Sequence, residues 1–517
     1  MAETLRSVNP TTGTVFGDPI PETGPEAVAQ AAKAARAAAP GLAALRPTER
    51  GDLMRAIAAA LTEHGDALVA LADAESGLGE ARLRGELART TGQFELYAAY
   101  AETGAALDIV IDHAAPRAAP PRPDLRRMNR PLGPVAVYAA SNFPLAFGVA
   151  GTDTAAALAA GCPVVAKAHA SQPATANLIE QIITVALAQH GADPHVFTVV
   201  SGFQAGLDLI RDPNLAAAAF TGSIAGGRAL AEEAAGRPEP IPFYGELGSL
   251  NPVVVTPEAI AQRGPALAEE FAASMTLGAG QFCTKPGLLF LPEGHGLEAA
   301  LADAVRAKQV HPMLNRRIWE AYTADAAELA AHPAARFAVE PKREGENGGE
   351  GANEEGGFAV SPGLIEAPAS AIDGDDTLLR ECFGPTALVL TYADAAELER
   401  VLPQLPGSLT ATVQLATSAD PVAGAVLPLL AERSGRVIVN GWPTGVAVSH
   451  AQHHGGPWPA STNARHTSVG TGAIERFARP VAYQSIPEAL LPEELHDDNE
   501  LGLQRRVDGE MEPAAKR

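Results

Sequence analysis

Cysteine is scarce in this chain of 517 residues, which carries three of them, at positions 162, 283 and 382. Three cysteines in so long a chain do not make the disulfide framework of a secreted domain, so they favour a reducing compartment. The chain also has no apolar N-terminal segment and no hydrophobic run long enough to cross a bilayer. We therefore expect a cytoplasmic protein without a signal peptide or a membrane span.

Positive charge is in the minority. Lysine and arginine number 38 against 61 aspartates and glutamates, which leaves a formal net charge of -23. Because nucleic acids and anionic membranes repel such a surface, we expect neither as a partner. A small anionic substrate remains compatible with this charge, since a single pocket can be positive on a negative protein.

Aromatic residues are also few, at 5%, while alanine and glycine are abundant. Hydrophobic residues make up 46% and charged residues 19%, which is the balance of a folded globular protein. These proportions predict cores of small, closely packed side chains. At this length the chain should divide into two or three domains.

Helical spacing of apolar residues from 24 to about 100 predicts three or four helices. Short apolar strands then alternate with helices. We expect strands at 135–139, 164–167, 196–200 and 217–220, and helices at 142–160, 174–190 and 205–210. This alternation indicates a parallel, doubly wound α/β sheet, which binds ligands at the carboxyl ends of its strands.

Three segments depart from this pattern. Residues 107–130 begin as a strand and become rich in proline and arginine, which predicts an extended excursion or hairpin. The acidic, glycine-rich stretch 342–357 is typical of a solvated loop, in a second α/β region that begins near Glu246. The charged residues from about Pro492 predict a poorly ordered tail.

Cys283, in GAGQFCTKPG, is the first candidate for chemistry. The glycines around it suit a loop with close backbone approach, and a thiolate is a strong nucleophile toward a carbonyl group. A buried structural cysteine is the alternative reading of this residue by itself. Cys162 and Cys382 are interpreted as structural.

Two further residues carry groups that carbonyl chemistry uses. Glu246, in PFYGELG, is placed to activate water, although it could equally be a solvated turn residue. Asn142, in YAASNFP, follows a predicted strand, where its amide can donate to a developing oxyanion. Capping of the predicted helix is the alternative role of this asparagine, and the two roles are compatible.

Six motifs connect these residues in one order along the chain. They are SNFP at 141–144, VVAKAHA at 164–170, FTGSIAGGR at 220–228, GELG at 245–248, GQFCTKPG at 280–287 and ECFGP at 381–385. In this order and at these separations, the chain resembles the aldehyde dehydrogenase superfamily over nearly its whole length.

The resemblance implies a catalytic role for each candidate. Cys283 would attack the aldehyde, and the Asn142 amide and the Cys283 backbone N–H would hold the resulting oxyanion. Glu246 would activate the water that hydrolyses the thioester. An esterase or acyl transferase that uses the same thiol without redox chemistry is the alternative from another class of enzyme.

The resemblance also implies a nicotinamide cofactor site. Lys167 would bind the adenosine ribose, Gly222 and Ser223 would meet the pyrophosphate, and Glu381 and Phe383 would position the nicotinamide ribose and ring. Ala170 stands where some relatives that prefer NAD carry a glutamate, which would repel a 2′-phosphate, and neither Ala170 nor the neighbouring His169 presents that obstacle. NADP is therefore favoured, and use of NAD stays open.

Two departures from the common pattern narrow the substrate. Ser141 replaces the tryptophan that many members have before the asparagine, and Ser249 replaces the second glycine of the E-L-G-G motif. In both positions the chain is similar to the α-ketoglutaric semialdehyde (2,5-dioxopentanoate) dehydrogenases and to the NADP-dependent fatty-aldehyde dehydrogenases. Residues 439–484 resemble the first group, so we expect oxidation of 2,5-dioxopentanoate to 2-oxoglutarate, with long-chain aldehydes as the alternative. Arg465 and the histidines at 450–454 are candidates for binding the substrate carboxylate, which needs a cation or several donors.

The same histidines do not predict a metal site, because acidic ligands and an HExxH pattern are missing near them. The architecture that the resemblance implies has a small oligomerisation element, and a homodimer or a dimer of dimers is expected. We expect a cofactor-binding domain at 1–106 and 131–245, a catalytic domain at 246–445, an oligomerisation element at 107–130 and 460–490, and a tail at 491–517.

Overall fold

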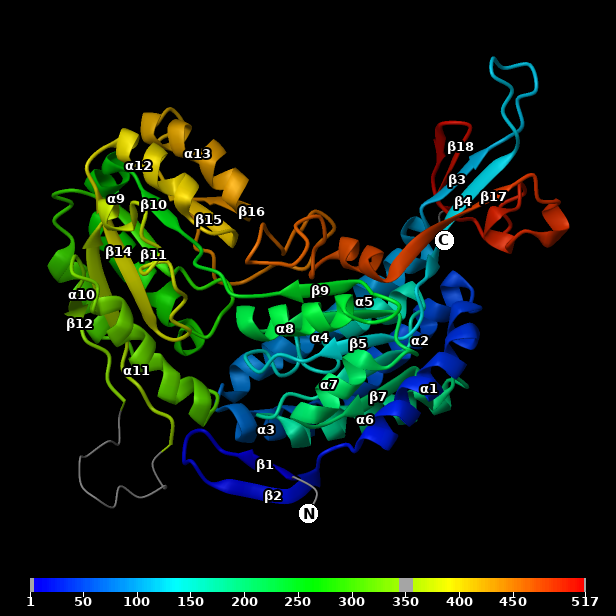
Figure 1. The fold of residues 1–517 in the computed structure, drawn as a ribbon, viewed down its shortest axis with the longest axis horizontal. Helices are drawn as coiled ribbons and strands as arrows, with labels where there is room; N and C mark the ends of the chain where they lie inside the picture. Colours follow the sequence, from blue (N-terminus) through cyan, green and yellow to red (C-terminus); the bar gives the residue numbers. More distant parts are fainter. Residues whose placement is uncertain (1–3, 344–356, 516–517) are drawn as a thin grey trace.

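The computed structural model of the protein describes residues 4–343 and 357–515. These residues form two α/β lobes and a projecting arm, each built on its own sheet (Figure 1). A separate antiparallel hairpin, β1 (Thr4–Val8) and β2 (Val15–Pro21), lies near the N-terminus. The predicted surface loop at 342–357 lies almost entirely outside the described residues.

The N-terminal lobe contains a five-stranded sheet in the order β7-β6-β5-β8-β9, with every neighbouring pair parallel. Its strands are β5 (Val135–Tyr138), β6 (Val164–Lys167), β7 (Phe197–Val200), β8 (Ala217–Thr221) and β9 (Phe243–Glu246). The valine and alanine side chains of β5 and β6 are buried on both faces, as a parallel sheet covered by helices requires. The predicted doubly wound arrangement is present here.

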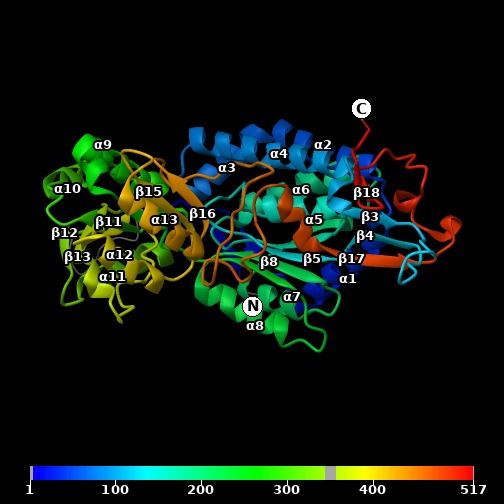
Figure 2. The ribbon, with the colours of Figure 1, turned by 90° about the horizontal axis from the view of Figure 1, so that it is seen from above.

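Helices cover this sheet on both sides (Figures 1 and 2). They are α1 (Pro25–Ala43), α2 (Pro47–Glu63), α3 (Gly65–Ser76), α4 (Glu80–Glu102), α5 (Thr152–Ala160), α6 (Pro173–Gln189), α7 (Phe203–Arg211) and α8 (Ile224–Ala235). Four of them fall between residues 24 and 102, where three or four were predicted. Leu53, Ile57 and Leu61 recur at helical spacing on α2 and are fully buried, so the apolar stripe seen in the sequence faces the core.

The helix predicted at 142–160 is wrong in its first ten residues, because α5 begins at Thr152. The buried Glu86 carboxylate accepts hydrogen bonds from the backbone N–H groups of Leu145 and Ala146, at 2.9 and 3.0 Å. These groups are therefore held by a side chain of α4 instead of by a helix. Asn142 accordingly lies in an irregular loop and does not cap a helix.

The second lobe contains a seven-stranded sheet in the order β12-β13-β14-β11-β10-β15-β16. Only β12 is antiparallel to its neighbour among the described strands of this sheet. Its strands are β10 (Val253–Val255), β11 (Leu288–Pro292), β12 (Arg336–Val339), β13 (Gly363–Pro368), β14 (Thr386–Tyr392), β15 (Ser408–Gln414) and β16 (Ser434–Val439). Its helices are α9 (Pro257–Thr276), α10 (Glu298–Arg306), α11 (Arg316–Ala330), α12 (Ala395–Val401) and α13 (Pro421–Arg433).

The arm is a five-stranded sheet in the order β17-β4-β3-β18-β19, which projects from the rest of the molecule (Figure 1). Its strands are β3 (Ile109–Asp112), β4 (Leu125–Pro131), β17 (Ala478–Gln484), β18 (Arg505–Val507) and β19 (Glu510–Glu512). The prediction of a poorly ordered tail is therefore wrong for these last two strands. β18 pairs in parallel with β3, and the Arg505 guanidinium, which is buried, donates to the carbonyls of His496 and Asp497.

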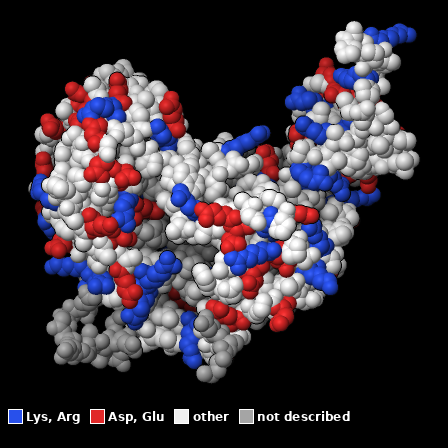
Figure 3. All heavy atoms as spheres, in the orientation of Figure 1, with Lys and Arg blue, Asp and Glu red and all other residues white. Residues whose placement is uncertain are grey.

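The described helices carry no long apolar segment, and one face of the molecule carries no large basic area (Figure 3). Among the residues that the structure describes, no helix combines the length and the apolar character that crossing a bilayer requires. Figure 3 shows one face of the molecule, on which lysine and arginine are interspersed with aspartate and glutamate rather than gathered in one large basic area. The excess of acidic residues is thus spread over both lobes on this face.

Candidate active site

The loop that carries Cys283 follows α9 and lies beside the segment 381–385. Three consecutive residues, Gly278, Ala279 and Gly280, adopt positive φ angles of 58°, 56° and 66°. A Cβ atom on Gly280 would come within 2.2 Å of the Gly384 carbonyl oxygen, so only glycine allows this approach. The glycines around the cysteine therefore have the role that the sequence suggested.

Buried polar side chains fix the position of this loop. Asn251 Nδ2 donates to the carbonyls of Cys283 and Lys285, each at 2.8 Å. The Ser249 hydroxyl lies 2.7 Å from Asn251 Oδ1, so the serine that departs from the common family pattern orients this asparagine. Lys285 Nζ in turn donates to the carbonyls of the 382–386 segment, which ties the two loops together.

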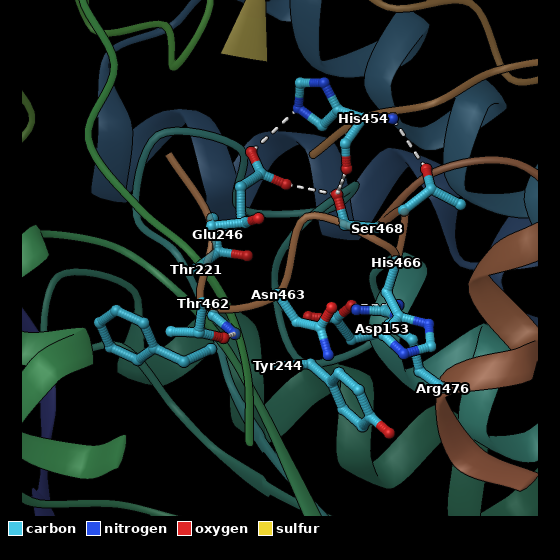
Figure 4. A pocket seen from close by; sticks show the side chains of 14 residues that line it. Asp153, Thr221, Tyr244, Glu246, His454, Thr462, Asn463, His466, Ser468 and Arg476 are labelled. Atoms are coloured by element: carbon cyan, nitrogen blue, oxygen red, sulfur yellow. Dashed lines mark hydrogen bonds and ion pairs between the residues drawn. The ribbon is translucent and has the colours of Figure 1, made fainter. Parts of the chain in front are cut away.

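The thiol, a histidine and a carboxylate meet at the junction of the two lobes. Cys283 Sγ lies 3.6 Å from His454 Nε2, and the same nitrogen lies 2.9 Å from Glu246 Oε1. The Ser468 hydroxyl donates to the other oxygen of Glu246, as Figure 4 shows. Glu246 and His454 are 4% and 1% exposed, so these side chains are held in place out of bulk water.

Electrostatics sets the resting protonation states of this group. Burial raises the pKa of the Glu246 carboxyl, but the neighbouring His454 and Ser468 outweigh this effect and hold that pKa below its ordinary value. Burial and the negative charge of Glu246 raise the pKa of the Cys283 thiol well above its ordinary value. The resting site therefore pairs an ionised Glu246 with a neutral thiol, which would have to lose its proton to act as a nucleophile.

Removal of the Glu246 charge should make the thiol easier to ionise. In Glu246→Gln the like charge beside Cys283 is gone, so the pKa of the thiol falls. The pH profile of Cys283 alkylation by iodoacetamide should then move to lower pH by about one to two units. Glu246→Asp, which keeps the charge, is the control and should stay close to the wild-type profile. An unchanged profile in Glu246→Gln would show that Glu246 does not raise the pKa of this thiol.

Asn142 lies next to the cysteine loop. Its Nδ2 donates to the carbonyl of Gln281 at 2.9 Å, two residues before Cys283, and this leaves a second N–H on the amide. Arg82 on α4 donates to the Asn142 carbonyl at 2.7 Å and so fixes its backbone. The Cys283 backbone N–H has no acceptor among the described residues. Two N–H groups are thus available beside Cys283 for a developing oxyanion.

The residues assigned to the cofactor lie at the carboxyl end of the five-stranded sheet and across the junction. Lys167 ends β6, and the Ser223 hydroxyl caps α8 by accepting from the Gly226 N–H at 3.2 Å. A Cβ on Gly248 would meet Glu381 Oε2 at 2.4 Å and the Ile224 side chain at 3.1 Å. The first turn of α8 and Glu381 are therefore close neighbours across Gly248.

The other residues that the resemblance assigns to the cofactor are His169 and Ala170, just after β6, and Glu381 and Phe383, in the segment 381–385. Burial, together with the charges of Lys167 and Arg317, lowers the pKa of His169 to about 3. Its Nδ1 accepts from the Ser171 N–H at 3.1 Å, and Ala170 beside it is exposed. Burial raises the pKa of Glu381 to about 7, and Phe383 lies two residues after it in the same segment.

Two residues that contact Glu246, His454 and Ser468, were not predicted from the sequence to lie there. His454 was considered only within a run of histidines for a metal or a substrate carboxylate, and Ser468 was not singled out. Glu246, Cys283 and His454 offer donor atoms that all lie within 4.8 Å of one another. Zinc accepts this combination of donors, so the expected absence of a metal stays a prediction. The one available sequence signal was that both residues lie in the segment 439–484, which resembles a single subgroup.

Comparison with known proteins identifies the family of this chain. The family model described as the aldehyde dehydrogenase family matches residues 1–479. The chain belongs to the aldehyde dehydrogenase family. This aldehyde dehydrogenase is 43% identical to α-ketoglutaric semialdehyde dehydrogenase 2 of Azospirillum brasilense, over 99% of this chain and 97% of that protein. It is 41% identical to α-ketoglutaric semialdehyde dehydrogenase of Acinetobacter baylyi, over 98% of this chain and 96% of that protein.

Solved structures show the same fold at lower sequence identity. Aldehyde dehydrogenase C of Pseudomonas syringae, solved as a mutant with NAD+ and octanal, superimposes on this aldehyde dehydrogenase with a TM-score of 0.79. The two share 20% identity, and the match covers 95% of each chain. Lactaldehyde dehydrogenase of Escherichia coli gives a TM-score of 0.78 at 23% identity, over 94% of this chain and 96% of that chain. The predicted fold class is therefore confirmed.

Proposed function

We propose that this aldehyde dehydrogenase oxidises 2,5-dioxopentanoate to 2-oxoglutarate with a nicotinamide dinucleotide, through a covalent bond to Cys283. The observation that carries the proposal is the buried contact of the Cys283 thiol with His454, which itself contacts Glu246. The names of the two relatives at 41–43% identity support the choice of substrate.

The first step is attack of the Cys283 sulfur on the aldehyde carbon. The thiol is neutral at rest, so a base must take its proton as the C–S bond forms. His454 Nε2 lies 3.6 Å from the sulfur and 2.9 Å from the ionised Glu246. A proton can therefore pass from the thiol to His454 Nε2, which then donates a hydrogen bond to Glu246, so the carboxylate stays ionised for the second step. The oxyanion of the thiohemiacetal is stabilised by the second N–H of the Asn142 amide and by the Cys283 backbone N–H.

The second half of the reaction hydrolyses a thioester. A nicotinamide dinucleotide supplies the hydride acceptor when it is bound. Glu246 then takes a proton from the water that attacks the thioester carbon, the C–S bond breaks, and the carboxylic acid leaves. His454 and Ser468 hold one oxygen each of the Glu246 carboxylate, so its orientation is fixed before water arrives.

The residues on the cofactor side fit such a dinucleotide. The Ser223 turn opens α8, where backbone N–H groups favour a pyrophosphate. Gly248 leaves room between Ile224 and Glu381 that a Cβ would fill. The Lys167 ammonium makes no hydrogen bond or ion pair with another described residue, so it can reach a ribose. Neither His169 nor Ala170 carries a negative charge, which supports acceptance of a 2′-phosphate and favours NADP over NAD.

Direct comparison of substrates tests the proposal. Initial rates of NADPH and NADH formation should be measured with 2,5-dioxopentanoate, succinic semialdehyde and decanal. We expect the highest kcat/KM for 2,5-dioxopentanoate, by about tenfold or more, and faster turnover with NADP than with NAD. A clear preference for decanal would assign the enzyme to long-chain aldehydes. Ester hydrolysis without any reduction of either cofactor would contradict the redox function.

We also infer that the arm joins two copies of the chain. Its sheet projects from the lobes, and β17 lies at one edge with backbone groups that another strand could pair with (Figure 1). The elongated arm therefore supports the expected homodimer or dimer of dimers. Sedimentation of the purified enzyme distinguishes these states from a monomer.

A further inference from the structure

One face of α4 carries four polar side chains toward the interior of the enzyme. Arg82, Glu86, Arg89 and Gln93 follow at spacings that place them along one side of a helix. Glu86 and Gln93 are 5% and 1% exposed. This set, which we name the polar stripe, faces a part of the molecule where a helix of a globular protein ordinarily packs apolar side chains.

Five polar side-chain atoms of the polar stripe lack a hydrogen-bond partner. In the described part of the chain, twelve buried side-chain nitrogen and oxygen atoms have no partner, and five of them belong to the stripe. They are Glu86 Oε2, Arg89 Nε and Nη2, and Gln93 Oε1 and Nε2. An unpartnered buried polar group is costly, so such a concentration indicates that something polar occupies this place in the working enzyme.

The stripe lies beside the reacting group. The Arg89 guanidinium lies over the ring of Phe147, 5.3 Å from its centroid, and that ring is 6.4 Å from the His454 ring. His454 in turn contacts the Cys283 sulfur. The positive charge of Arg89 also lowers the pKa of Cys283, against the stronger effect of burial. Arg89 is thus a cation close to the nucleophile, with free N–H groups.

A second cation lies on the side of the second lobe. Arg436 on β16 donates to the carbonyls of Pro443 and Gly445, while its Nε is buried without a partner. The loop that contains Pro443 and Gly445 continues to Val446, which packs against a hydrophobic cluster that includes Phe147. Arg436 interacts electrostatically with Cys283, as Arg89 does, so the two arginines approach this residue from opposite lobes. The Arg465 candidate, by contrast, is exposed.

We propose that Arg89, assisted by Gln93 and Arg436, forms an anion subsite that binds the carboxylate end of the substrate while its aldehyde end reaches Cys283. This subsite deepens the proposed function and rests on it. In an extended 2,5-dioxopentanoate the carboxylate carbon lies about 5 Å from the aldehyde carbon, four C–C bonds away. A guanidinium with two free N–H groups suits a carboxylate, and the Gln93 amide suits the 2-oxo group. A long alkyl chain would leave all of these groups unpaired.

The test compares a charged aldehyde with an uncharged aldehyde of the same length. kcat/KM should be measured for 2,5-dioxopentanoate and for pentanal, with saturating cofactor, in the wild type, Arg89→Met, Arg89→Lys and Arg84→Met. Arg84 lies on the same helix but pairs at the surface with Glu80 and Asp66, so it is the matched control. In Arg89→Met the ratio of the two kcat/KM values should fall about 10- to 100-fold. In Arg89→Lys this ratio should fall less than in Arg89→Met, and in Arg84→Met it should stay at the wild-type value.

A binding measurement gives a readout that does not depend on turnover. 2-Oxopentanoate has the same carboxylate end and a methyl group in place of the aldehyde, so it should protect Cys283 from iodoacetamide. Half-protection should need about tenfold more of it in Arg89→Met than in the wild type. An equal loss on both aldehydes, or unchanged protection, would overturn the subsite. A wild type that does not prefer 2,5-dioxopentanoate to pentanal would overturn the proposed substrate, which separates the two failures.

Discussion

Cys283→Ala should lower the rate of aldehyde oxidation by at least about 1000-fold, because no other group replaces a lost nucleophile. The thiol is the one sulfur that contacts the His454–Glu246 pair among the described residues. Alanine fits the loop, since the hydrogen bonds from Asn251 go to backbone carbonyls and remain. The measurement is reduced cofactor formed per enzyme, in the steady state and in a single turnover.

Cys162→Ala provides the control for this prediction. Cys162 is fully buried, its thiol lies 3.2 Å from the Phe477 carbonyl, and burial raises its pKa to about 11. Cys162→Ala should lower the free energy of unfolding but leave aldehyde oxidation in place. Cofactor binding by Cys283→Ala, followed by fluorescence, should stay close to wild type. Substantial oxidation by Cys283→Ala would mean that the reaction does not pass through this thiol.

Glu246→Gln should separate the two halves of the reaction. Glutamine keeps the shape of the side chain and can still contact His454 and Ser468, but it cannot accept a proton from water. Hydrolysis of the thioester should therefore slow by about 100- to 10,000-fold. Rapid mixing should show a burst close to one reduced cofactor per active site, followed by a slow steady state, and mass spectrometry should find an acyl group on Cys283.

The kinetics of a second variant, His454→Gln, should distinguish two possible roles of His454. If His454 only positions Glu246, His454→Gln should show a weaker form of the same burst, because one of the two contacts to the carboxylate remains. If His454 takes the proton of the thiol, His454→Gln should instead slow the burst phase itself. A Glu246→Gln variant that lacks a burst would show that Glu246 acts before the thioester forms, and would contradict its assignment to hydrolysis.

Much of the N-terminal lobe could be predicted from local signals. The apolar runs of β5 to β8 are short, lie between turns, and alternate with helices whose apolar residues recur at helical spacing. The observed bounds of these four strands differ from the predicted ones by one residue or less at each end. Such elements depend chiefly on their own residues, so their positions need little knowledge of the remaining chain.

The errors arose where distant residues decide the local structure. Residues 142–151 have the apolar character of a helix, but Glu86 on α4 holds their N–H groups in a loop. Residues 505–512 look like a charged tail, but β3 offers a strand edge and Arg505 finds carbonyls to bind. In both places a hydrogen-bond partner far along the chain outweighs local propensity.

The sequence by itself determined the chemistry of the candidate site, because a thiol, a carboxylate and an amide in family order predict a covalent reaction of aldehydes. Only the tertiary structure decided what surrounds that thiol. His454 lies 171 residues after Cys283, and their contact depends on how the two lobes and the 454–468 segment meet. The unpartnered groups of α4 likewise have meaning only because folding buries them near Cys283. Spacing along a helix predicts which side chains share a face, whereas the packing of distant elements determines what that face meets.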